Sequence, residues 1–580
     1  MENKYRNNYC GKATEQDIDK NLRLAGWVEN IRDHGGIIFV DLRDETGVIQ
    51  LVSNDEHMFD NLTKESTISV NGIIRKRNED DYNANLTTGT IELLVQDIEI
   101  LGKSKHVLPF DIKTSHEVSE ELRLKYRYLD LRNKKVRKNI NLRAKVLKFL
   151  RDEMDSLGFL EVQTPIISAS SPEGARDFLI PSRKFHGKFY ALPQAPQIYK
   201  ELLMTGGVDK YYQIAPCFRD EDSRADRTME FYQLDFEMSF VEENDIYEIG
   251  EKVFYDTFTK FSNKEVSKPP FRRISYKESM LKYGTDKPDL RNPLEIIDIT
   301  KILENTTFGP FKKSIIRAIK VDDIGTNSNS WFNEIVDYAK TIGMPGIGYI
   351  TLLEDGTLKG PIDKFLSEEE RKNLIEETSM KANSVLFFIA NRKEATAAKF
   401  AGLIRTYLGK KIGLIDDNKF EFCIINDFPM FEYNEEDKKY DFCHNPFSLP
   451  KGGIKAIKDG NLDEILAYQF DFVCNGYEMS SGALRNHDIE LLELAFEKVG
   501  YSKEIVEKKF GSLYNAFQYG APPHGGMAPG IDRIIMLLND VSNLREVQAF
   551  PTSASGQDNL MNAPSEVTEQ QLRELHIKIR

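Results

Sequence analysis

A strand with one polar face, directly after an arginine-rich turn, constrains the fold of this chain more than any other feature. Residues 217–240 read CFRDEDSRADRTMEFYQLDFEMSF, and from Phe231 onward polar and apolar residues alternate. Because successive side chains of a strand point to opposite faces, Gln233, Asp235 and Glu237 share one face and apolar residues share the other. Carboxylates there could hold an ammonium group or Mg²⁺. A half-exposed strand at a sheet edge would show the same alternation.

The turn before this strand carries Arg219, Arg224 and Arg227 among acidic neighbours. An arginine at a turn can hold a phosphate or a carboxylate with two parallel hydrogen bonds. A surface ion pair is the commoner role of any single arginine. The turn therefore indicates an anion site only in combination with the polar-faced strand.

A second cluster, HGGMAPGIDRIIMLL, combines glycines with the start of a helix. Gly525, Gly526 and Gly530 allow the backbone to approach a ligand, and a helix that begins near Ile531 would direct its N-terminus at that ligand. Arg533 falls in the first turn, where a cation opposes the helix dipole, so we expect it to serve a ligand. The GxxxxGK[ST] pattern of a Walker loop is absent from the sequence.

Two further segments carry charged residues in apolar surroundings. AYQFDFVCNGYEMSSGALRNH contains Asp471 and Glu478, followed by Arg485. LPQAPQIYKELLM places Gln197 and Lys200 three residues apart, so the two share a face if the segment is helical. An ordinary strand and turn, and an ordinary surface helix, would have the same patterns.

Length and hydrophobic patterning predict the domain organisation. A chain of 580 residues is expected to form three or four domains. Five short runs rich in β-branched residues before about residue 105 suit a small closed barrel such as the OB-fold, whose open face binds oligonucleotides. A helical pattern ends at Gly158, and mixed helices and strands without a chemical motif follow residue 295. We interpret these later residues as an inserted domain.

Composition and terminal sequence exclude several protein classes. A net charge of −14 excludes a wholly basic nucleic-acid coat, although not a local basic surface. None of the five cysteines forms a CxxC pair, so neither a zinc knuckle nor a disulfide framework is indicated. The first residues lack the apolar core of a signal peptide, and no run approaches the roughly 20 apolar residues that span a bilayer. A cytoplasmic protein without a membrane partner is the expectation.

Together, the four clusters resemble the class II aminoacyl-tRNA synthetases. GFLEVQTPII resembles their motif 1, FRDED…RTMEF their motif 2 and GGMAPGIDR their motif 3. SPEGARDF, QAPQIYK, YGTDKPDLR, HNPF and NGYEMSSGALRNH narrow the resemblance to bacterial-type aspartyl-tRNA synthetases. The resemblance covers nearly the whole chain.

The resemblance implies an α+β multidomain fold: an N-terminal OB-fold β-barrel, a class II synthetase antiparallel sheet flanked by helices, and an inserted α/β domain. The implied segments are 1–107 (anticodon-binding OB-fold), 108–137 (hinge), 138–294 (first catalytic part), 295–413 (inserted domain), 414–563 (second catalytic part) and 564–580 (C-terminal extension).

The resemblance also implies a two-step reaction. The α-carboxylate of aspartate attacks the α-phosphorus of ATP, and the aspartyl group then passes to the terminal 3′-hydroxyl of a tRNA. Positioning and charge neutralisation would carry the rate, with Arg219 and Arg533 as catalytic residues. The residues implied to bind aspartate are Glu173, Gln197, Lys200, Arg219, Asp235, His444 and Arg485. Those implied to bind ATP are Arg219, Asp220, Glu221, Glu478, Gly530, Ile531, Asp532 and Arg533. Asp471 and Glu478 would hold Mg²⁺.

One position departs from the family pattern. The residue after Arg227 is often a glutamine that contributes to ATP binding, whereas this chain has Thr228. A short hydroxyl side chain does not reach as far as a glutamine amide. We therefore do not carry this ATP contact over.

Four residues of the barrel match positions that contact the anticodon in the family: His34, Phe39, Gln50 and Glu92. Phe39 would stack on a base, and Gln50 and Glu92 would contact base edges. Enzymes restricted to the aspartate tRNA commonly have leucine at the position of His34, whereas relaxed enzymes commonly have histidine. We therefore expect both the aspartate and the asparagine tRNA to be charged. A histidine that only lines the loop, in a strictly discriminating enzyme, is the alternative. The family is usually a homodimer, built in part on motif 1 around Pro165.

Two other kinds of function are alternatives: a relative specific for another amino acid, and a paralogue without catalytic activity. In a lysyl-specific enzyme the pair Lys200 and Arg485 would repel the substrate ammonium, and an asparaginyl-specific enzyme is the other relative to separate. A non-catalytic RNA-binding paralogue would be expected to lack Arg219, Glu478 or Arg533. The sequence retains all three.

Overall fold

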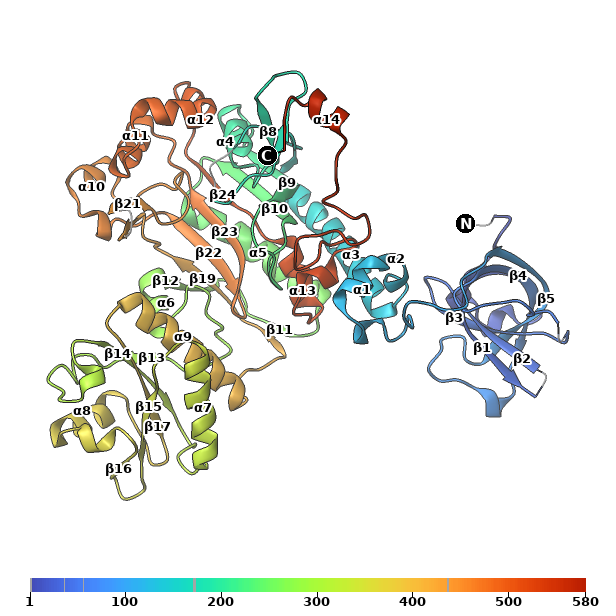
Figure 1. Cartoon of the computed structure of the whole chain (residues 1–580), viewed down its shortest axis with the longest axis horizontal. Helices are drawn as coiled ribbons and strands as arrows, with labels where there is room; N and C mark the ends of the chain where they lie inside the picture. The colour runs from blue at the N-terminus through green and yellow to red at the C-terminus, as the bar shows by residue number, and fades with distance from the viewer. Residues whose placement is uncertain (1–2, 36, 56, 171–173, 436–437, 580) are drawn as a thin grey trace. The chain divides into compact units, whose positions relative to one another are not determined.

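The computed structural model of this chain describes every residue except 1–2, 36, 56, 171–173, 436–437 and 580. It contains two compact units, Met1–Val118 and Ser119–Arg580, which are shown in Figure 1 and described separately below.

The first unit is a closed five-stranded barrel. Its strand order is β1-β2-β3-β5-β4, and β1 pairs with β4 to close it. Neighbouring strands are antiparallel except for β3 and β5, which are parallel. Alternate residues such as Leu24, Val40 and Leu51 fill the interior completely, which is the period-2 pattern expected of a barrel wall. The strands are β1 (Asn21–His34), β2 (Ile37–Arg43), β3 (Val48–Val52), β4 (Thr67–Lys76) and β5 (Ile91–Gly102).

The second unit is built around an eight-stranded sheet with the order β12-β19-β22-β23-β24-β10-β9-β6. Its interior pairings are antiparallel, and only the two outermost pairs, β12 with β19 and β6 with β9, are parallel. The strands are β6 (Leu160–Glu161), β9 (Lys210–Phe218), β10 (Glu230–Ser239), β12 (Arg272–Ser275), β19 (Phe422–Asn426), β22 (Gln469–Cys474), β23 (Tyr477–Leu484) and β24 (His524–Met527).

One face of this sheet packs on a single large apolar core. Leu150 of α3 (Lys134–Ser156), Phe254 of α5 (Glu243–Phe261) and Ile534 of α13 (Ile531–Leu538) are each 0% exposed within it. On β10 the apolar set includes Phe236, which confirms the alternation predicted from the sequence. Because these helices cover the apolar face, the polar face of β10 is turned the other way, toward the site described below.

Smaller elements complete the second unit. Two-stranded sheets are formed by β7 (Leu179–Pro181) with β8 (Phe189–Ala191), β11 (Glu265–Val266) with β18 (Lys419–Phe420), and β20 (Phe431–Asn434) with β21 (Lys439–Phe442). The remaining helices outside the inserted region are α1 (Glu120–Lys125), α2 (Arg127–Asp130), α4 (Gln197–Thr205), α6 (Tyr276–Lys282), α10 (Gly453–Asp459), α11 (Ile489–Lys498), α12 (Lys503–Phe517) and α14 (Glu569–Glu574).

The inserted region contains its own five-stranded sheet, β13-β14-β17-β15-β16, in which every pairing is antiparallel. Helices cover both faces of this sheet. The adjacent residues Phe387 and Phe388 of β17 point to opposite faces, and Phe387 packs with α7 and α9 whereas Phe388 packs with α8. The elements are β13 (Ile296–Asp298), β14 (Ile315–Val321), α7 (Asn329–Thr341), β15 (Gly348–Leu352), β16 (Leu358–Lys359), α8 (Glu368–Glu377), β17 (Val385–Asn391) and α9 (Glu394–Lys411).

Helix α9 is joined closely to the segment that leads into the inserted region. Arg405 is 1% exposed and donates hydrogen bonds to the carbonyl oxygens of Leu294 and Asn292, at 2.5 Å each. A Cβ atom added at Gly402 would lie 2.7 Å from the carbonyl oxygen of Gly284. The two backbones therefore touch, and a side chain has no room between them.

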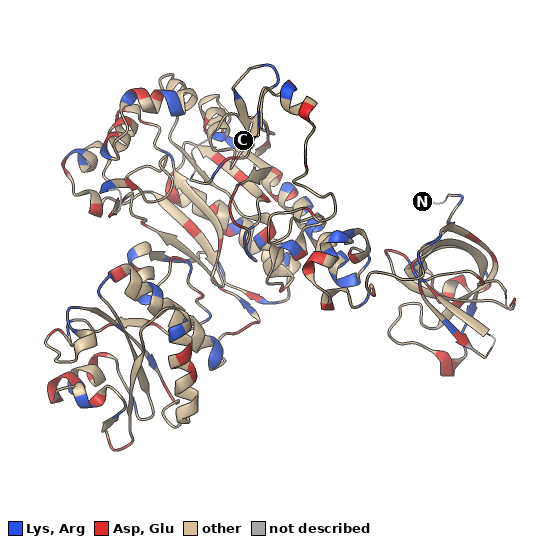
Figure 2. Ribbon diagram, viewed as in Figure 1, with Lys and Arg blue, Asp and Glu red and all other residues tan. Residues whose placement is uncertain are grey.

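The fold class predicted from the sequence is confirmed: an N-terminal OB-type barrel, an antiparallel sheet flanked by helices, and an inserted region of helices and strands. The predicted helix ending near Gly158 is α3. All five cysteines are free thiols. Among the described residues, no helix is both long and apolar enough to cross a membrane. Figure 2 shows acidic and basic residues interspersed over the helices of the inserted region and over α10–α12.

The contact between Gly402 and Gly284 predicts an asymmetry between two helical glycines. In Gly402→Ala, overpacking should cost about 1–3 kcal/mol of folding free energy. This cost exceeds the roughly 1 kcal/mol by which alanine is favoured over glycine inside a helix, so the variant should be less stable than the wild type. Gly511 of α12 has open space around its Cβ position, so Gly511→Ala should be neutral or stabilising. Thermal unfolding midpoints of the two variants test this, and equal midpoints would contradict the close packing.

Candidate active site

A cavity of about 620 Å³ lies on the polar face of β10. Its walls come from α4, the turn between β9 and β10, the β22–β23 hairpin and the start of α13. The structure thus brings together segments that are far apart in the sequence. The predicted site residues that line this cavity are Gln197, Lys200, Arg219, Glu221, Asp235, His444, Asp471, Glu478, Arg485, Gly530, Asp532 and Arg533.

The inner end of the cavity contains paired charges. The ammonium group of Lys200 lies 2.9 Å from Asp235 Oδ2 and 3.2 Å from Glu237 Oε2. Arg485 donates to both oxygens of Glu237, from Nε at 2.7 Å and from Nη2 at 3.1 Å. All four side chains are at most 3% exposed. The resemblance implies that Lys200 and Arg485 bind the substrate aspartate, and in the structure each of these cations already has a carboxylate partner.

These pairings decide which groups stay charged. Burial disfavours the Lys200 ammonium, but the charges of Asp235 and then Glu237 outweigh burial and raise its pKa. Burial likewise opposes ionisation of Glu237, yet Arg485 and Lys200 hold the pKa of Glu237 below its usual value. For Asp235, burial prevails and raises the pKa. Asp235 Oδ1 is buried and has no hydrogen-bond partner among the described residues, so it remains available to a donor on a ligand.

A second buried set extends this network behind the cavity. Gln197 donates to Glu201 Oε1 at 2.6 Å, and His524 Nε2 lies 3.2 Å from Glu201 Oε2. Burial lowers the pKa of His524, but the hydrogen bond to Glu201 outweighs burial, so the pKa is raised. Gln197, which lines the cavity, is therefore oriented by Glu201.

Two carboxylates predicted to hold Mg²⁺ lie together on the β22–β23 hairpin. Asp471 is buried, and burial followed by the charge of Glu478 raises its pKa well above the usual value. Its Oδ1 has no hydrogen-bond partner among the described residues. Lys287 lies 3.2 Å from Glu478 Oε2, and although burial opposes its charge, Glu478 raises its pKa. An unpaired carboxylate oxygen beside a second carboxylate fits a hard cation with oxygen ligands. Within the described residues, no group of three or more acidic, histidine or cysteine ligands surrounds one point.

The arginine-rich turn forms the outer wall of the cavity. The guanidinium of Arg219 lies over the ring of Phe231, 5.0 Å from its centroid, and it forms no ion pair with a described carboxylate. Such a cation is fixed in place by the ring and remains able to bind an anion. Glu221 is paired with Arg227 at 2.7 Å. Asp220 does not line the cavity, and its amide donates to the carbonyl oxygen of Arg176 at 3.0 Å.

The four predicted residues at the start of α13 are placed differently from one another. Gly530 precedes the helix and lines the cavity, and Arg533 Nη1 donates to the carbonyl oxygen of Glu478 at 2.6 Å. The Ile531 side chain is 0% exposed in the apolar core, so only its backbone could meet a ligand. The Asp532 carboxylate accepts hydrogen bonds from Arg143 and from the Tyr232 amide. Its carboxylate therefore ties α13 to α3 and β10.

The sequence interpretation of two glycines is wrong. Gly525 and Gly526 lie in β24, between β23 and β10, where a Cβ at Gly526 would lie 2.0 Å from the carbonyl oxygen of Phe236. A Cβ at Gly525 would meet Ile246 at 2.6 Å. Close packing within the sheet and against α5 requires these glycines, rather than approach to a ligand.

Three other positions noted in the sequence are His444, Glu173 and Thr228. His444 lines the cavity with its ring edge against Phe428, at a centroid distance of 5.0 Å. Glu173 lies outside the described residues. The Thr228 hydroxyl is buried and donates to the carbonyl oxygen of Glu230 at 2.8 Å.

In the barrel, strand register places three of the four predicted anticodon residues, Phe39, Gln50 and Glu92, on one face. Gln50 faces Glu92 across β3 and β5, and its amide donates to Glu92 at 2.8 Å. Phe39 precedes Asp41 by two residues on β2, so the two share a face, and Asp41 faces Gln50. His34 ends β1 opposite Ile37; the His34 side chain lies outside the described part of the chain.

Sequence reasoning missed several charged members of both sites. Glu237 was placed on the polar face, but not among the site residues, although it joins Lys200 to Arg485. Lys287 lies in the quoted segment YGTDKPDLR, which could have indicated it. In the barrel, Arg32 and Arg75 donate to Gln50 and Glu92 at 3.2 and 2.7 Å.

Comparison with known proteins agrees with this geometry. The family model for tRNA synthetases class II (D, K and N) matches residues 119–554, and a model for the OB-fold nucleic acid binding domain matches residues 22–101. Proteins named aspartate–tRNA(Asp/Asn) ligase are similar over the full length. That of Ehrlichia ruminantium (strain Welgevonden) is 50% identical, covering 100% of this chain and 99% of the relative. That of Wolbachia pipientis wMel is 51% identical, covering 100% of both.

Solved structures share the fold. An asparaginyl-tRNA synthetase from Pyrococcus horikoshii, complexed with asparaginyl-adenylate, superposes with a TM-score of 0.56 and 20% identity, covering 94% of this chain and 97% of that one. A putative aspartyl-tRNA synthetase from Leishmania major gives a TM-score of 0.58 at 20% identity, covering 95% of each chain. The resemblance noted in the sequence is confirmed by the family model and by the full-length relatives: the chain belongs to the class II tRNA synthetases (D, K and N).

Proposed function

We propose that the protein attaches L-aspartate to tRNA through an aspartyl-adenylate formed from ATP. The observation that carries this proposal is the convergence of Lys200, Arg485, Arg219 and Arg533 on one cavity. The first two would receive the side-chain carboxylate of aspartate, and the other two would contact the phosphates. The names of the full-length relatives agree with this substrate.

The inner charges favour an acidic amino acid. Lys200 has one donor left after its contacts with Asp235 and Glu237, and Arg485 Nη1 has no partner among the described residues. These donors suit a carboxylate, and a lysine side chain would meet two cations there. The unpartnered Asp235 Oδ1 would accept from the α-ammonium group, because a buried acceptor without a donor is costly. An asparagine amide would leave the two cations less well neutralised.

In the first step, an oxygen of the substrate α-carboxylate attacks the α-phosphorus, and the bond from phosphorus to the pyrophosphate oxygen breaks. Arg219, held on Phe231, would neutralise charge that develops on the α-phosphate, and Arg533 would act from the α13 side. Asp471 and Glu478 would hold Mg²⁺, which would neutralise the phosphates of ATP. The protein supplies orientation and fixed charge rather than a covalent intermediate.

The barrel is proposed to bind the anticodon. Its row of Phe39, Gln50 and Glu92 combines an aromatic face with hydrogen-bonding groups, which is how OB-folds contact single-stranded bases. Histidine at position 34 and the names of the relatives favour charging of both aspartate and asparagine tRNAs. A strictly discriminating enzyme is the second candidate. A non-catalytic paralogue is disfavoured, because Arg219, Glu478 and Arg533 all line one cavity.

An isotope-exchange assay between ATP and pyrophosphate tests the adenylation step. Exchange should depend on aspartate and on Mg²⁺, and it should not be supported by asparagine or lysine. Arg219→Ala should lower the exchange rate by about 10²–10³-fold, the usual loss for one donor to a developing anion, without a change in thermal midpoint. Arg224→Ala, an exposed arginine of the same turn, is the matched control and should behave as the wild type. Absence of exchange with any amino acid would favour the non-catalytic paralogue.

Charging of purified tRNAs tests the anticodon proposal. The wild type should aminoacylate both aspartate and asparagine tRNAs with aspartate. His34→Leu should lower kcat/KM for asparagine tRNA relative to aspartate tRNA by about tenfold, the scale of one base contact. Pyrophosphate exchange should stay at the wild-type rate, because it needs no tRNA. Failure of the wild type to charge asparagine tRNA would establish the discriminating enzyme instead.

A second copy of this chain is proposed to cover the edge of the large sheet at β6. Leu160, Ile166 and Ile167 are 57%, 48% and 56% exposed there, next to an outermost strand. Exposed apolar residues beside an open edge suit a dimer interface. Light scattering at micromolar concentration should give twice the chain mass of 66.6 kDa, and Ile167→Glu should give the monomer mass. A monomeric wild type would contradict the proposal.

A further inference from the structure

A short helical turn after α13, η8 (Leu544–Val547), supports the arginine-rich turn from outside the cavity. The amide of Leu544 donates to the carbonyl oxygen of Ala225 at 2.8 Å. Arg545 Nη1 donates to the carbonyl oxygen of Arg224 at 3.1 Å. Leu544 itself lines the cavity. The backbone of the turn at Arg224 and Ala225, next to Asp226, Arg227 and Thr228, is thus held by η8.

Gln548 adds a third point of support. Its amide lies within hydrogen-bond distance of the Thr228 hydroxyl, at 3.4 Å, and of the Glu230 carbonyl oxygen, at 3.3 Å. Thr228 is the position where the family commonly has glutamine. Here the hydroxyl serves the backbone of the turn, and an amide from outside the turn approaches it.

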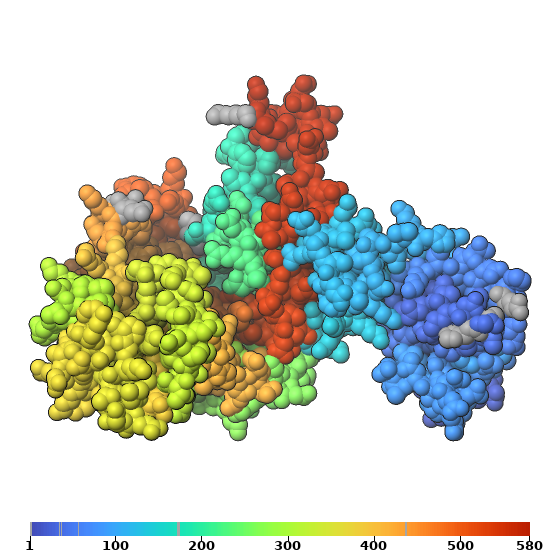
Figure 3. Space-filling model, turned by 60° about the horizontal axis from the view of Figure 1, so that its bottom comes forward, coloured from blue at the N-terminus to red at the C-terminus, as the bar shows by residue number. Residues whose placement is uncertain are grey.

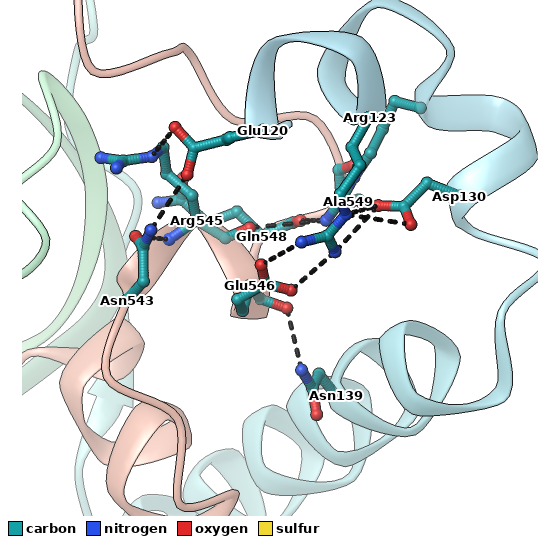
Figure 4. A network of polar contacts seen from close by, with 10 residues as sticks. Glu120, Arg123, Asp130, Asn139, Asn543, Arg545, Glu546, Gln548 and Ala549 are labelled. Atoms are coloured by element: carbon teal, nitrogen blue, oxygen red, sulfur yellow. Dashed lines mark hydrogen bonds and ion pairs between the residues drawn. The ribbon is translucent and has the colours of Figure 1, made fainter. Parts of the chain in front are cut away.

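The side chain of Arg545 is itself fixed by Glu120, the first residue of α1. Arg545 Nε donates to Glu120 Oε1 at 2.9 Å, and Asn543 donates to Glu120 Oε2 at 3.0 Å (Figure 4). The Arg545 side chain is 8% exposed and that of Glu120 is 32% exposed. A planar guanidinium can make both contacts at once because its donors form a rigid fork, which a lysine lacks.

A second set of hydrogen bonds holds η8 against α1 and α3. Arg123 of α1 donates to both oxygens of Glu546, at 2.6 and 2.9 Å, and its Nε also contacts Asp130 of α2. Asn139 of α3 donates to the Glu546 carbonyl oxygen at 3.1 Å. Figure 4 shows these side chains pointing toward one another, and in Figure 3 the red C-terminal segment lies against the cyan segment that contains α1 and α2. Helices far away in sequence therefore hold η8 in one position.

We propose that Arg545 is a positioning residue for ATP binding, acting through the backbone of the turn that contains Arg219 and Arg227, and that Glu120 orients it. This inference rests on the proposed function, because it assumes that the turn binds ATP. The amino-acid end of the cavity, at Lys200 and Arg485, makes no contact with η8 among the described hydrogen bonds and ion pairs. Loss of Arg545 should therefore affect ATP far more than aspartate.

The kinetic test uses Arg545→Met, which keeps the length and apolar contacts of the stem but removes both hydrogen bonds. We expect the KM for ATP in pyrophosphate exchange to rise about tenfold, as for loss of a charge-assisted hydrogen bond, and the KM for aspartate to change less than about twofold. For Arg545→Lys, the KM for ATP should lie between the values of the wild type and of Arg545→Met. Arg371→Met is the matched control, since Arg371 of the inserted region donates from Nε to Asp363 Oδ1 at 2.8 Å and from Nη2 to the Asp363 carbonyl oxygen at 2.9 Å, and neither residue lines the cavity.

Hydrogen–deuterium exchange of the ligand-free proteins gives a readout that needs no activity. Peptides covering residues 219–230 should exchange faster in Arg545→Met than in the wild type or in Arg371→Met, and Glu120→Gln should show the same change to a smaller extent. Equal rises in both KM values, or unchanged exchange in residues 219–230, would overturn the proposal. If the wild type itself gave no aspartate-dependent activity, the proposed function would fail, while the exchange result would still decide whether Arg545 holds the turn.

Discussion

The buried cluster of Lys200, Asp235, Glu237 and Arg485 is the interaction on which the rest of the site depends. Each of these groups would be costly to bury alone, and each is tolerated because the others neutralise it. The cluster joins α4 to β10 and to the end of β23, so the amino-acid end of the cavity cannot form until these three elements are packed. Stability and substrate recognition therefore rest on the same side chains.

The sheet is arranged to keep this cluster in place. The apolar residues of β10 pack against α3, α5 and α13, while the polar ones face the cavity, so a register shift of one residue would exchange the two sets. On one side, β24 fits against β10 only because Gly526 lacks a side chain. Asp532, at the start of α13, ties that helix to Arg143 of α3 and to the Tyr232 amide of β10. The strand that carries the site is thus fixed on several sides before a ligand binds.

Period-2 and helical patterns predicted the elements and the direction of their polar faces. They found β10 with Asp235, the helix with Lys200 and the barrel strands, because those features depend on neighbours in sequence. They did not find that Glu237 joins the two cations, that Lys287 approaches Glu478 or that Ile531 is buried, because those facts depend on which distant segments meet. Gly525 and Gly526 were interpreted through the nearby helix start, whereas strand pairing with β10 and β23 requires them. The specific anion and cation roles came from resemblance to a family.

The mutual pairing of Lys200 and Arg485 with carboxylates has a consequence for the empty enzyme. A recess lined by unpaired cations would attract chloride or phosphate from the medium, and those ions would have to leave before an amino acid could enter. Here the formal charges of Lys200 and Arg485 are balanced internally by Asp235 and Glu237. A small anion would meet only the spare donors of Lys200 and Arg485 in the vacant recess, whereas an amino acid would also bring an ammonium group to Asp235 Oδ1.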